Sequence, residues 1–184
     1  MATYVKYQTF IGDLAGKVHD LVGTAGSGAD TCKVILSNAA PNVATHAVRG
    51  DVTELSTANG YTSGGTSIAN VGTASGGTFT LVGTDVTFTA SGGSIGPFRY
   101  AIVYNDTPTS PADPLICYFD YGSAVTLLDT ETITVDFGAS LFTLFVGHRT
   151  HRAHDTAVLT RTARLLLAGV VEGVGDRGSF AVAD

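Results

Sequence analysis

Three histidines in the last quarter of the chain have the type and spacing of possible metal ligands. His148, His151 and His154 stand three residues apart, and Asp155 follows directly. Imidazole and carboxylate groups bind zinc and other transition metals. However, no cysteine or carboxylate pair completes a familiar ligand set, and the two arginines inside this segment would repel a cation. The pattern favours solvated or interface histidines, with a metal site as the weaker alternative.

Other residues that could do chemistry also have a plainer interpretation. Five aspartates recur near expected turns and strand ends, namely Asp106, Asp113, Asp120, Asp129 and Asp136. They could serve as acid–base groups or calcium ligands, but no D-x-D-x-D-G loop is present, and aspartate is a common turn former. The glycine-rich pieces match neither phosphate-binding motif, and no G-x-S-x-G segment occurs. The sequence therefore predicts no cofactor and no enzyme.

Five aromatic residues could form a platform for a sugar ring: Tyr100, Tyr104, Tyr118, Phe119 and Tyr121. Their alternation along expected strands favours core packing and cross-strand pairing instead. Carbohydrate binding stays open as an alternative.

The overall charge and hydropathy exclude several partners. The 184 residues carry a net charge of −6, and only 14% are charged, which argues against a nucleic-acid partner. No signal peptide is expected, and no apolar run reaches the roughly 18 residues of a membrane helix. The composition thus predicts a soluble protein made in a cytoplasm. Cys32 and Cys117 are isolated, which favours buried free thiols over a disulfide.

The elements that position these residues are short strands. The centre is Ala90–Thr107, where a glycine-rich turn and Pro97 lead into an aromatic and β-branched run. Its even-numbered residues Phe98, Tyr100, Ile102 and Tyr104 share one face. Further strands are expected at Thr31–Leu36, Thr78–Val82, Asp85–Ala90, Leu115–Tyr121, Ala124–Leu128, Glu131–Phe137 and Leu141–Val146. Gly83-Thr84 predicts a hairpin between the second and third of these. The regular spacing predicts an all-β fold, an antiparallel β-sandwich.

The two ends and two loops complete the expected organisation. The spacing of Phe10, Leu14 and Val18 predicts a short N-terminal helix, preceded by a strand or arm. Residues 22–30 are expected to be a flexible loop, and residues 57–77 a long loop with an edge strand. We expect a sandwich domain with its N-terminal arm over 1–146 and a C-terminal extension over 147–184. A helix at about 156–168 is possible, although its threonines and valines also suit a strand.

Several segments resemble a family of small structural proteins of tailed bacteriophages and prophages. They are GPFRYAIVYNDTPTSPADPLICYFDYGSAVTL at 96–127, ETITVDF at 131–137, and the N-terminal pattern from MATYVKYQTF through TCKVILSNAAPNVAT to DVTELSTANGYTSGG. The resemblance covers about residues 1–145, and GPFRYA and SPADPLI are its more specific parts. This chain departs from it at Cys117-Tyr118-Phe119, where glycine and two aromatic residues are more usual, and in its extension after residue 146.

The resemblance implies a virion protein without catalytic residues. We expect a decoration or cement protein on the outer capsid surface, with the major capsid protein and further copies of itself, as a dimer or trimer, for partners. The expected contact residues are Tyr4, Tyr7, Phe10, Arg149, Arg152, Arg161, Arg164 and Phe180. A tail component (tube, terminator or tip protein) and a carbohydrate-binding β-sandwich on the virion are the alternatives.

Overall fold

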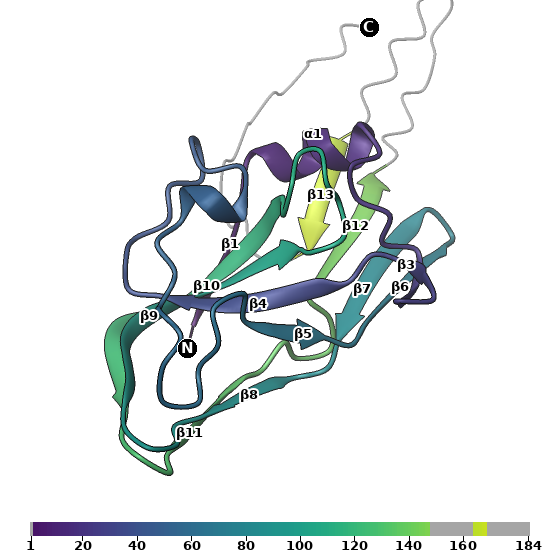
Figure 1. Cartoon of the computed structure of the whole chain (residues 1–184). Helices are drawn as coiled ribbons and strands as arrows, with labels where there is room; N and C mark the ends of the chain where they lie inside the picture. The colour runs from purple at the N-terminus through teal and green to yellow at the C-terminus, as the bar shows by residue number, and fades with distance from the viewer. Residues whose placement is uncertain (1, 148–163, 169–184) are drawn as a thin grey trace, which may run out of the picture.

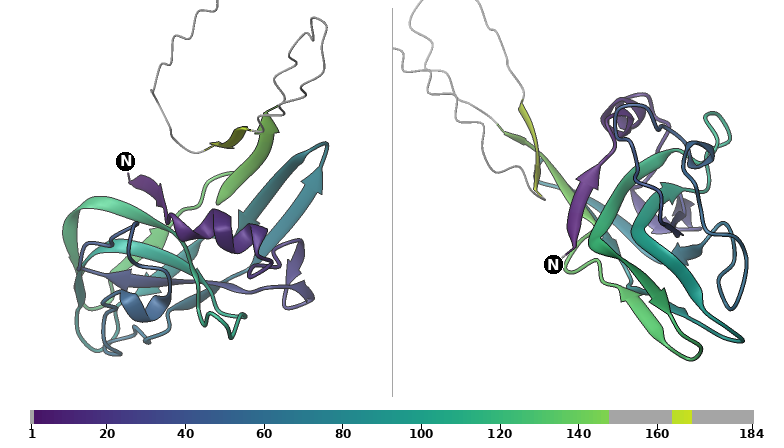
Figure 2. Two further views of the ribbon diagram at one scale, coloured as in Figure 1. Left: turned by 90° about the horizontal axis from the view of Figure 1, so that it is seen from above. Right: turned by 90° about the vertical axis from the view of Figure 1, so that its left-hand side faces the viewer.

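The computed structural model describes residues 2–147 and 164–168, which form three β-sheets packed as two layers, one short α-helix and a 3-10 turn (Figure 1). The first sheet is antiparallel throughout, with strand order β1-β10-β9-β4-β5. Its strands are β1 (Thr3–Lys6), β10 (Leu115–Leu127), β9 (Ile95–Asn105), β4 (Cys32–Ser37) and β5 (Thr66–Ile68). The right-hand view of Figure 2 shows β1 at the outer edge of this sheet, beside β10.

The second layer has the order β13-β12-β7-β6-β2-β3, and a two-stranded ribbon of β8 and β11 continues it. Its strands are β2 (Gly23–Ala25), β3 (Gly28–Ala29), β6 (Asn70–Ser75), β7 (Thr78–Gly83), β8 (Val86–Thr89), β11 (Thr132–Val135), β12 (Phe142–Gly147) and β13 (Arg164–Ala168). The pair of β8 and β11 continues the pair of β7 and β12 beyond a break, because β8 follows β7 and β12 follows β11 along the chain. Among the strands of residues 2–147 and 164–168, only β2 and β3 pair in parallel.

Strand β9 is the centre of the fold because both of its faces are buried over residues 102–105. Val103 belongs to the core between the two layers, together with Val34, Leu81 and Phe142. The neighbouring Ile102 belongs to a second cluster on the opposite face of the sheet. That cluster also holds Tyr7, Ile35, Tyr100, Tyr104 and Leu115. The prediction of a central strand in Ala90–Thr107 and of an all-β sandwich is confirmed. The prediction that Phe98 shares a face with Tyr100, Ile102 and Tyr104 is wrong, since Phe98 belongs to the core between the layers.

The N-terminal segment is part of the sandwich. Strand β1 pairs with β10, and the helix α1 (Thr9–Ala15) follows it, as the spacing of Phe10 and Leu14 predicted. Phe10 is fully buried and contacts Phe142 edge to face, with ring centroids 5.1 Å apart. A 3-10 turn, η1, spans Arg49–Asp51. No helix in the described ranges is long and apolar enough to cross a membrane.

Three local predictions are wrong. The strands at 78–83 and 86–89 do not form a hairpin, since β7 pairs with β6 and β12 while β8 pairs with β11. Gly83-Thr84 is a bend between two strands that run end to end. Residues 22–30 hold β2 and β3 rather than an irregular loop, because they can pair with β6.

The third correction concerns the possible helix at 156–168. Residues 164–168 form β13, which pairs with β12, so strand pairing outweighs the helix propensity of the leucine-rich run. Residues 156–163 lie outside the described residues. The proposed division after residue 146 stays a prediction.

Cys32 and Cys117 are buried free thiols, as predicted. They lie opposite Asn105 and Val103 of β9, respectively, so β9 runs between their two strands. Two strand spacings amount to roughly 10 Å. This separation exceeds the limit of about 7 Å between the Cα atoms of a disulfide.

Close packing of the second layer gives a stability test at Gly72. A Cβ atom at this position would clash with the backbone carbonyl of Leu21. We expect Gly72→Ala to lower the free energy of unfolding by roughly 2 kcal/mol or more, because backbone rather than a flexible side chain must move. Urea unfolding monitored by circular dichroism measures this change.

Gly12→Ala is the matched control, because nothing lies within 4 Å of its added methyl group. Alanine should be neutral or slightly stabilising in this helix. Equal stability of the Gly72→Ala protein and the wild type would contradict the close contact between β6 and the segment before β2.

Candidate functional site

A buried polar cluster links the end of β9 to two loops. The Asn105 side-chain amide donates to the Asp30 carboxylate at 2.7 Å and lies 3.0 Å from Nδ1 of His19. The same carboxylate oxygen accepts the backbone N–H of Asp20 at 2.7 Å. Asn70 donates to the Asp30 carbonyl oxygen at 3.0 Å and accepts the backbone N–H of Cys32 at 2.9 Å. These bonds tie together segments that are far apart in sequence.

The cluster fixes the protonation state of His19. Since the Asn105 amide nitrogen is a donor, Nδ1 of His19 accepts, and the proton of the neutral ring is on Nε2. Nε2 is buried without a hydrogen-bond partner among the described residues. Burial lowers the pKa of His19 to about 4, against the opposing effect of the Asp30 carboxylate. The imidazole is therefore neutral at pH 7 and acts as a structural acceptor.

Three of the five aspartates predicted as turn formers bond to the backbone, and the other two form ion pairs. Asp120, Asp129 and Asp136 accept backbone N–H groups of glycines at 2.6–2.8 Å. Asp106 pairs with Lys33, and Asp113 pairs with Arg49. Within residues 2–147 and 164–168, no three His, Cys, Asp or Glu side chains come together as a possible metal site.

The predicted aromatic residues do not form an exposed platform. Tyr100 and Tyr104 are buried, and Tyr118 packs edge to face against both Tyr7 and Tyr100. Phe119 turns to the opposite face of β10 and contacts Tyr4 and Phe137. Tyr121 alone of the five is largely exposed, at 56%.

The structure places the predicted contact residues in different environments. Tyr7 and Phe10 are fully buried in the two core clusters, so their side chains are not offered to a partner in this chain. Tyr4 is half-buried and lines a groove described below. Arg164 begins β13. The remaining candidates lie outside the described residues, namely His148, Arg149, His151, Arg152, His154, Arg161 and Phe180.

One face of the second sheet is a candidate interaction surface. Four neighbouring strands, β2, β6, β7 and β12, contain no charged residue. On the side away from the core, Val71 lies directly opposite Val82, and they are 41% and 43% exposed. We call this surface the threonine–valine face, which consists of Thr24, Val71, Thr73, Thr80, Val82 and Thr143. A solvated sheet face normally carries charges, so this composition makes the face a candidate contact surface.

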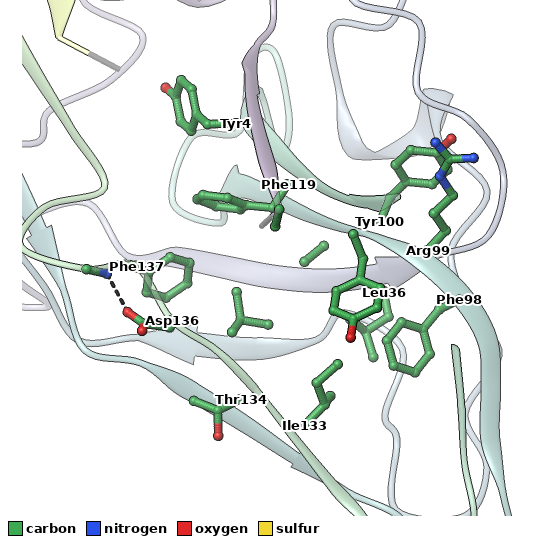
Figure 3. A pocket seen from close by; sticks show the side chains of 15 residues that line it. Tyr4, Leu36, Phe98, Arg99, Tyr100, Phe119, Ile133, Thr134, Asp136 and Phe137 are labelled. Carbon is green, nitrogen blue, oxygen red and sulfur yellow. Dashed lines mark hydrogen bonds between the residues drawn. The ribbon is translucent and has the colours of Figure 1, made fainter. Parts of the chain in front are cut away.

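A groove of about 720 Å³ opens at the side of the sandwich, between β1 of the first sheet and β11 of the second layer. Figure 3 shows the side chains of Tyr4, Phe98, Phe119, Ile133 and Phe137 surrounding it. Tyr4 packs edge to face on Phe119 with ring centroids 5.6 Å apart. The ring centroids of Phe119 and Phe137 are in turn 5.7 Å apart. The groove is thus an aromatic extension of the core that strands do not cover.

Arg99 at the rim of the groove is neutralised by Asp120, whereas Asp136 on the β11 side accepts the backbone N–H of Gly138. Arg99 binds Asp120 through two hydrogen bonds of 2.7 and 2.8 Å, and it stacks 5.3 Å above the Tyr100 ring. This pairing lowers the pKa of the Asp120 carboxyl. Burial raises the pKa of the Tyr4 hydroxyl well above its usual range. These groups therefore keep fixed charge states near pH 7 and suit an apolar occupant.

No family model matches this chain, and no curated protein or solved structure matches it. Its function therefore has to be inferred from its residues, its fold and its surfaces.

The threonine–valine face carries a signal that sequence reasoning could have used. The segments 70–83 and 142–147 together lack any charged residue. The polar cluster had no such signal, because His19, Asp30 and Asn105 are brought together only by the fold.

The neutral state of His19 predicts a pH-dependent stability. Its pKa is about 4 in the folded chain and 6.5 in the unfolded chain, so the unfolded chain binds more protons between these values. We expect the stability to be complete above pH 6.5 and to fall as the pH drops towards 4. The loss between pH 7 and pH 5 should be on the order of 2 kcal/mol. Urea unfolding at several pH values measures it.

His46→Gln is the control, because His46 lies outside the buried cluster. This variant should keep the pH dependence, whereas His19→Gln should remove the part between pH 5 and 7. If the free energy of unfolding of His19→Gln depended on pH as that of the wild type does, another group would be the cause of the pH dependence.

Proposed function

We propose that this chain is a structural protein of a bacteriophage virion, which binds the outer surface of the capsid as a decoration or cement protein. Its partners are the major capsid protein and further copies of itself. The resemblance of residues 96–127 and 131–137 to small phage structural proteins supports this proposal. The net charge of −6 is also unsuited to a nucleic-acid partner.

The observation that carries the proposal is the threonine–valine face. A surface of hydroxyl, methyl and backbone groups can be buried without desolvating a charge, which would cost several kcal/mol if left unpaired. Exposed valines add favourable burial of apolar area, at about 25 cal/mol per Å². An uncharged sheet face of this kind suits a contact that is repeated many times over a regular surface.

Stabilisation of the head follows from mass action. A protein that binds the assembled shell but not its free subunits lowers the free energy of the assembled state. Closed symmetry is the usual arrangement of identical subunits, which fits a dimer or trimer at a local symmetry axis. The chain is made in the host cytoplasm and acts on the virion.

A tail component is the closest alternative. Separation of heads and tails from virions of the encoding phage, followed by gel densitometry, distinguishes the two. A decoration protein should appear in the head fraction at a copy number comparable to the capsid protein. Recovery in the tail fraction alone would replace the capsid proposal by the tail alternative.

A single charge should weaken binding to the head. Val82→Glu places a carboxylate in the middle of the threonine–valine face, opposite Val71. Because the side chain is exposed, the fold should persist. Affinity for purified heads should fall by roughly tenfold or more, since the carboxylate would be desolvated without a partner. Co-sedimentation with heads that lack this protein measures the loss.

Thr89→Glu is the matched control, because Thr89 is also exposed but lies on β8, outside this face. It should bind as the wild type does. If Val82→Glu and Thr89→Glu bound heads equally well, the threonine–valine face would not be part of the contact.

A further inference from the structure

We propose that the edge of β11 beside the groove binds an extended segment of a partner protein, which adds to the sheet as a further strand. The segment that fits has apolar residues at alternate positions and a basic residue at each end. This inference does not depend on a virion role. It follows from the backbone of β11, from the apolar side chains next to it and from the charges around it.

The backbone of β11 offers hydrogen-bonding groups along one side. Strand β11 pairs with β8, and no other strand within residues 2–147 and 164–168 pairs with it. The carbonyl oxygen of Glu131 accepts the backbone N–H of Ala90, just after β8, at 2.9 Å. Because the bonding direction alternates along an antiparallel strand, the N–H and C=O groups of Thr132 and Thr134 point away from β8. These groups can bind the backbone of an added strand.

The groove lies along this edge. Six consecutive residues, 133–138, line it on the β11 side, and Figure 3 shows Tyr4 and Phe119 across from them. Ile133 and Val135 pack against the core between the layers. In a strand added beside β11, every second side chain would be level with these two residues and would lie over the aromatic rings. An open edge next to pockets for alternate side chains is the arrangement that binds extended peptides.

The charges around the edge favour a basic segment. The ribbon of β8 and β11 with its flanking turns, residues 83–93 and 128–141, contains no lysine or arginine. It contains four carboxylates, each of which accepts a backbone N–H within the ribbon, namely Asp85, Asp129, Glu131 and Asp136. None of the four forms an ion pair with a described residue. A basic partner is therefore complementary to this edge.

The same charges disfavour β11 of a second copy as the partner. Glu131 and Asp136 flank the four uncharged residues of β11. If two copies of β11 paired antiparallel about a twofold axis at the centre of the strand, Glu131 would lie opposite Asp136, and like charges directly opposite each other are destabilising. A segment with lysine or arginine at these two positions would form ion pairs instead.

A peptide titration of the full-length protein, followed by NMR, tests the proposal. The probe is the capped peptide Lys-Val-Thr-Val-Thr-Lys. When it pairs antiparallel with its lysines opposite Glu131 and Asp136, its valines are level with Ile133 and Val135. At saturation it should slow hydrogen exchange of the Thr134 amide by roughly tenfold or more, because this N–H gains an acceptor. The amides of Ile133 and Val135, which bond to β8, report that the ribbon stays folded.

Two control peptides and two variants separate the contributions. Glutamate in place of both lysines should abolish binding, and threonine in place of both valines should weaken it by roughly tenfold or more. Asp136→Asn should weaken binding of the lysine peptide by roughly threefold, because the amide still accepts from Gly138 but has lost the charge. Asp51→Asn is the matched control, since Asp51 is also exposed and accepts backbone N–H groups but lies outside the groove. It should bind as the wild type does.

Three results would overturn the proposal. The first is failure of the lysine peptide to bind more tightly than the glutamate peptide. The second is binding that leaves the exchange of the Thr134 amide unchanged. The third is slow exchange of this amide in the peptide-free protein. That result would show that the edge is covered by another part of this chain, or by a second copy if the protection rises with protein concentration.

Discussion

The structure depends on the burial of both faces of β9 over residues 102–105. This stretch has no access to water, so each of its polar groups needs a partner within the protein. Neighbouring strands satisfy its backbone, and Asp30 and His19 satisfy the Asn105 side chain. One cover of β9 is the second sheet, and the other is formed by Tyr7 and the segment around Val43 and Val52. The N-terminal segment is folded into the body for this reason.

The sequence was informative where a residue's environment is set by its near neighbours. The aromatic and β-branched run at Phe98–Tyr104 could be predicted as a central strand, and Phe10 and Leu14 as a helix face. The sequence was not informative where pairing between segments that are distant in sequence determines the structure. Gly83-Thr84 has the residues of a hairpin turn, yet the same residues allow a bend between β7 and β8, and only the partners β12 and β11 distinguish the two. Residues 164–168 likewise form a strand because β12 is beside them.

The candidate surfaces were harder to predict than the fold. Alternation predicts which side chains of β6 and β7 point outward, but not that four uncharged strands lie side by side. The groove cannot be predicted from local sequence, because its walls come from β1, β10 and β11, and its size depends on which strand edges stay unpaired. Tyr7 and Phe10 illustrate the converse error, since residues near the N-terminus were expected at a contact surface but form the core.

The two surfaces differ in chemistry. The groove is lined by aromatic side chains, whereas the threonine–valine face presents hydroxyl and methyl groups and suits, in our account, a repeated partner. A reconstruction of the virion with this protein labelled tests this assignment most directly. Our account predicts density on the outside of the head, with the surface of β6 and β7 that carries Val71 and Val82 turned towards the capsid shell. Label on the tail alone, or that surface turned towards solvent, would contradict it.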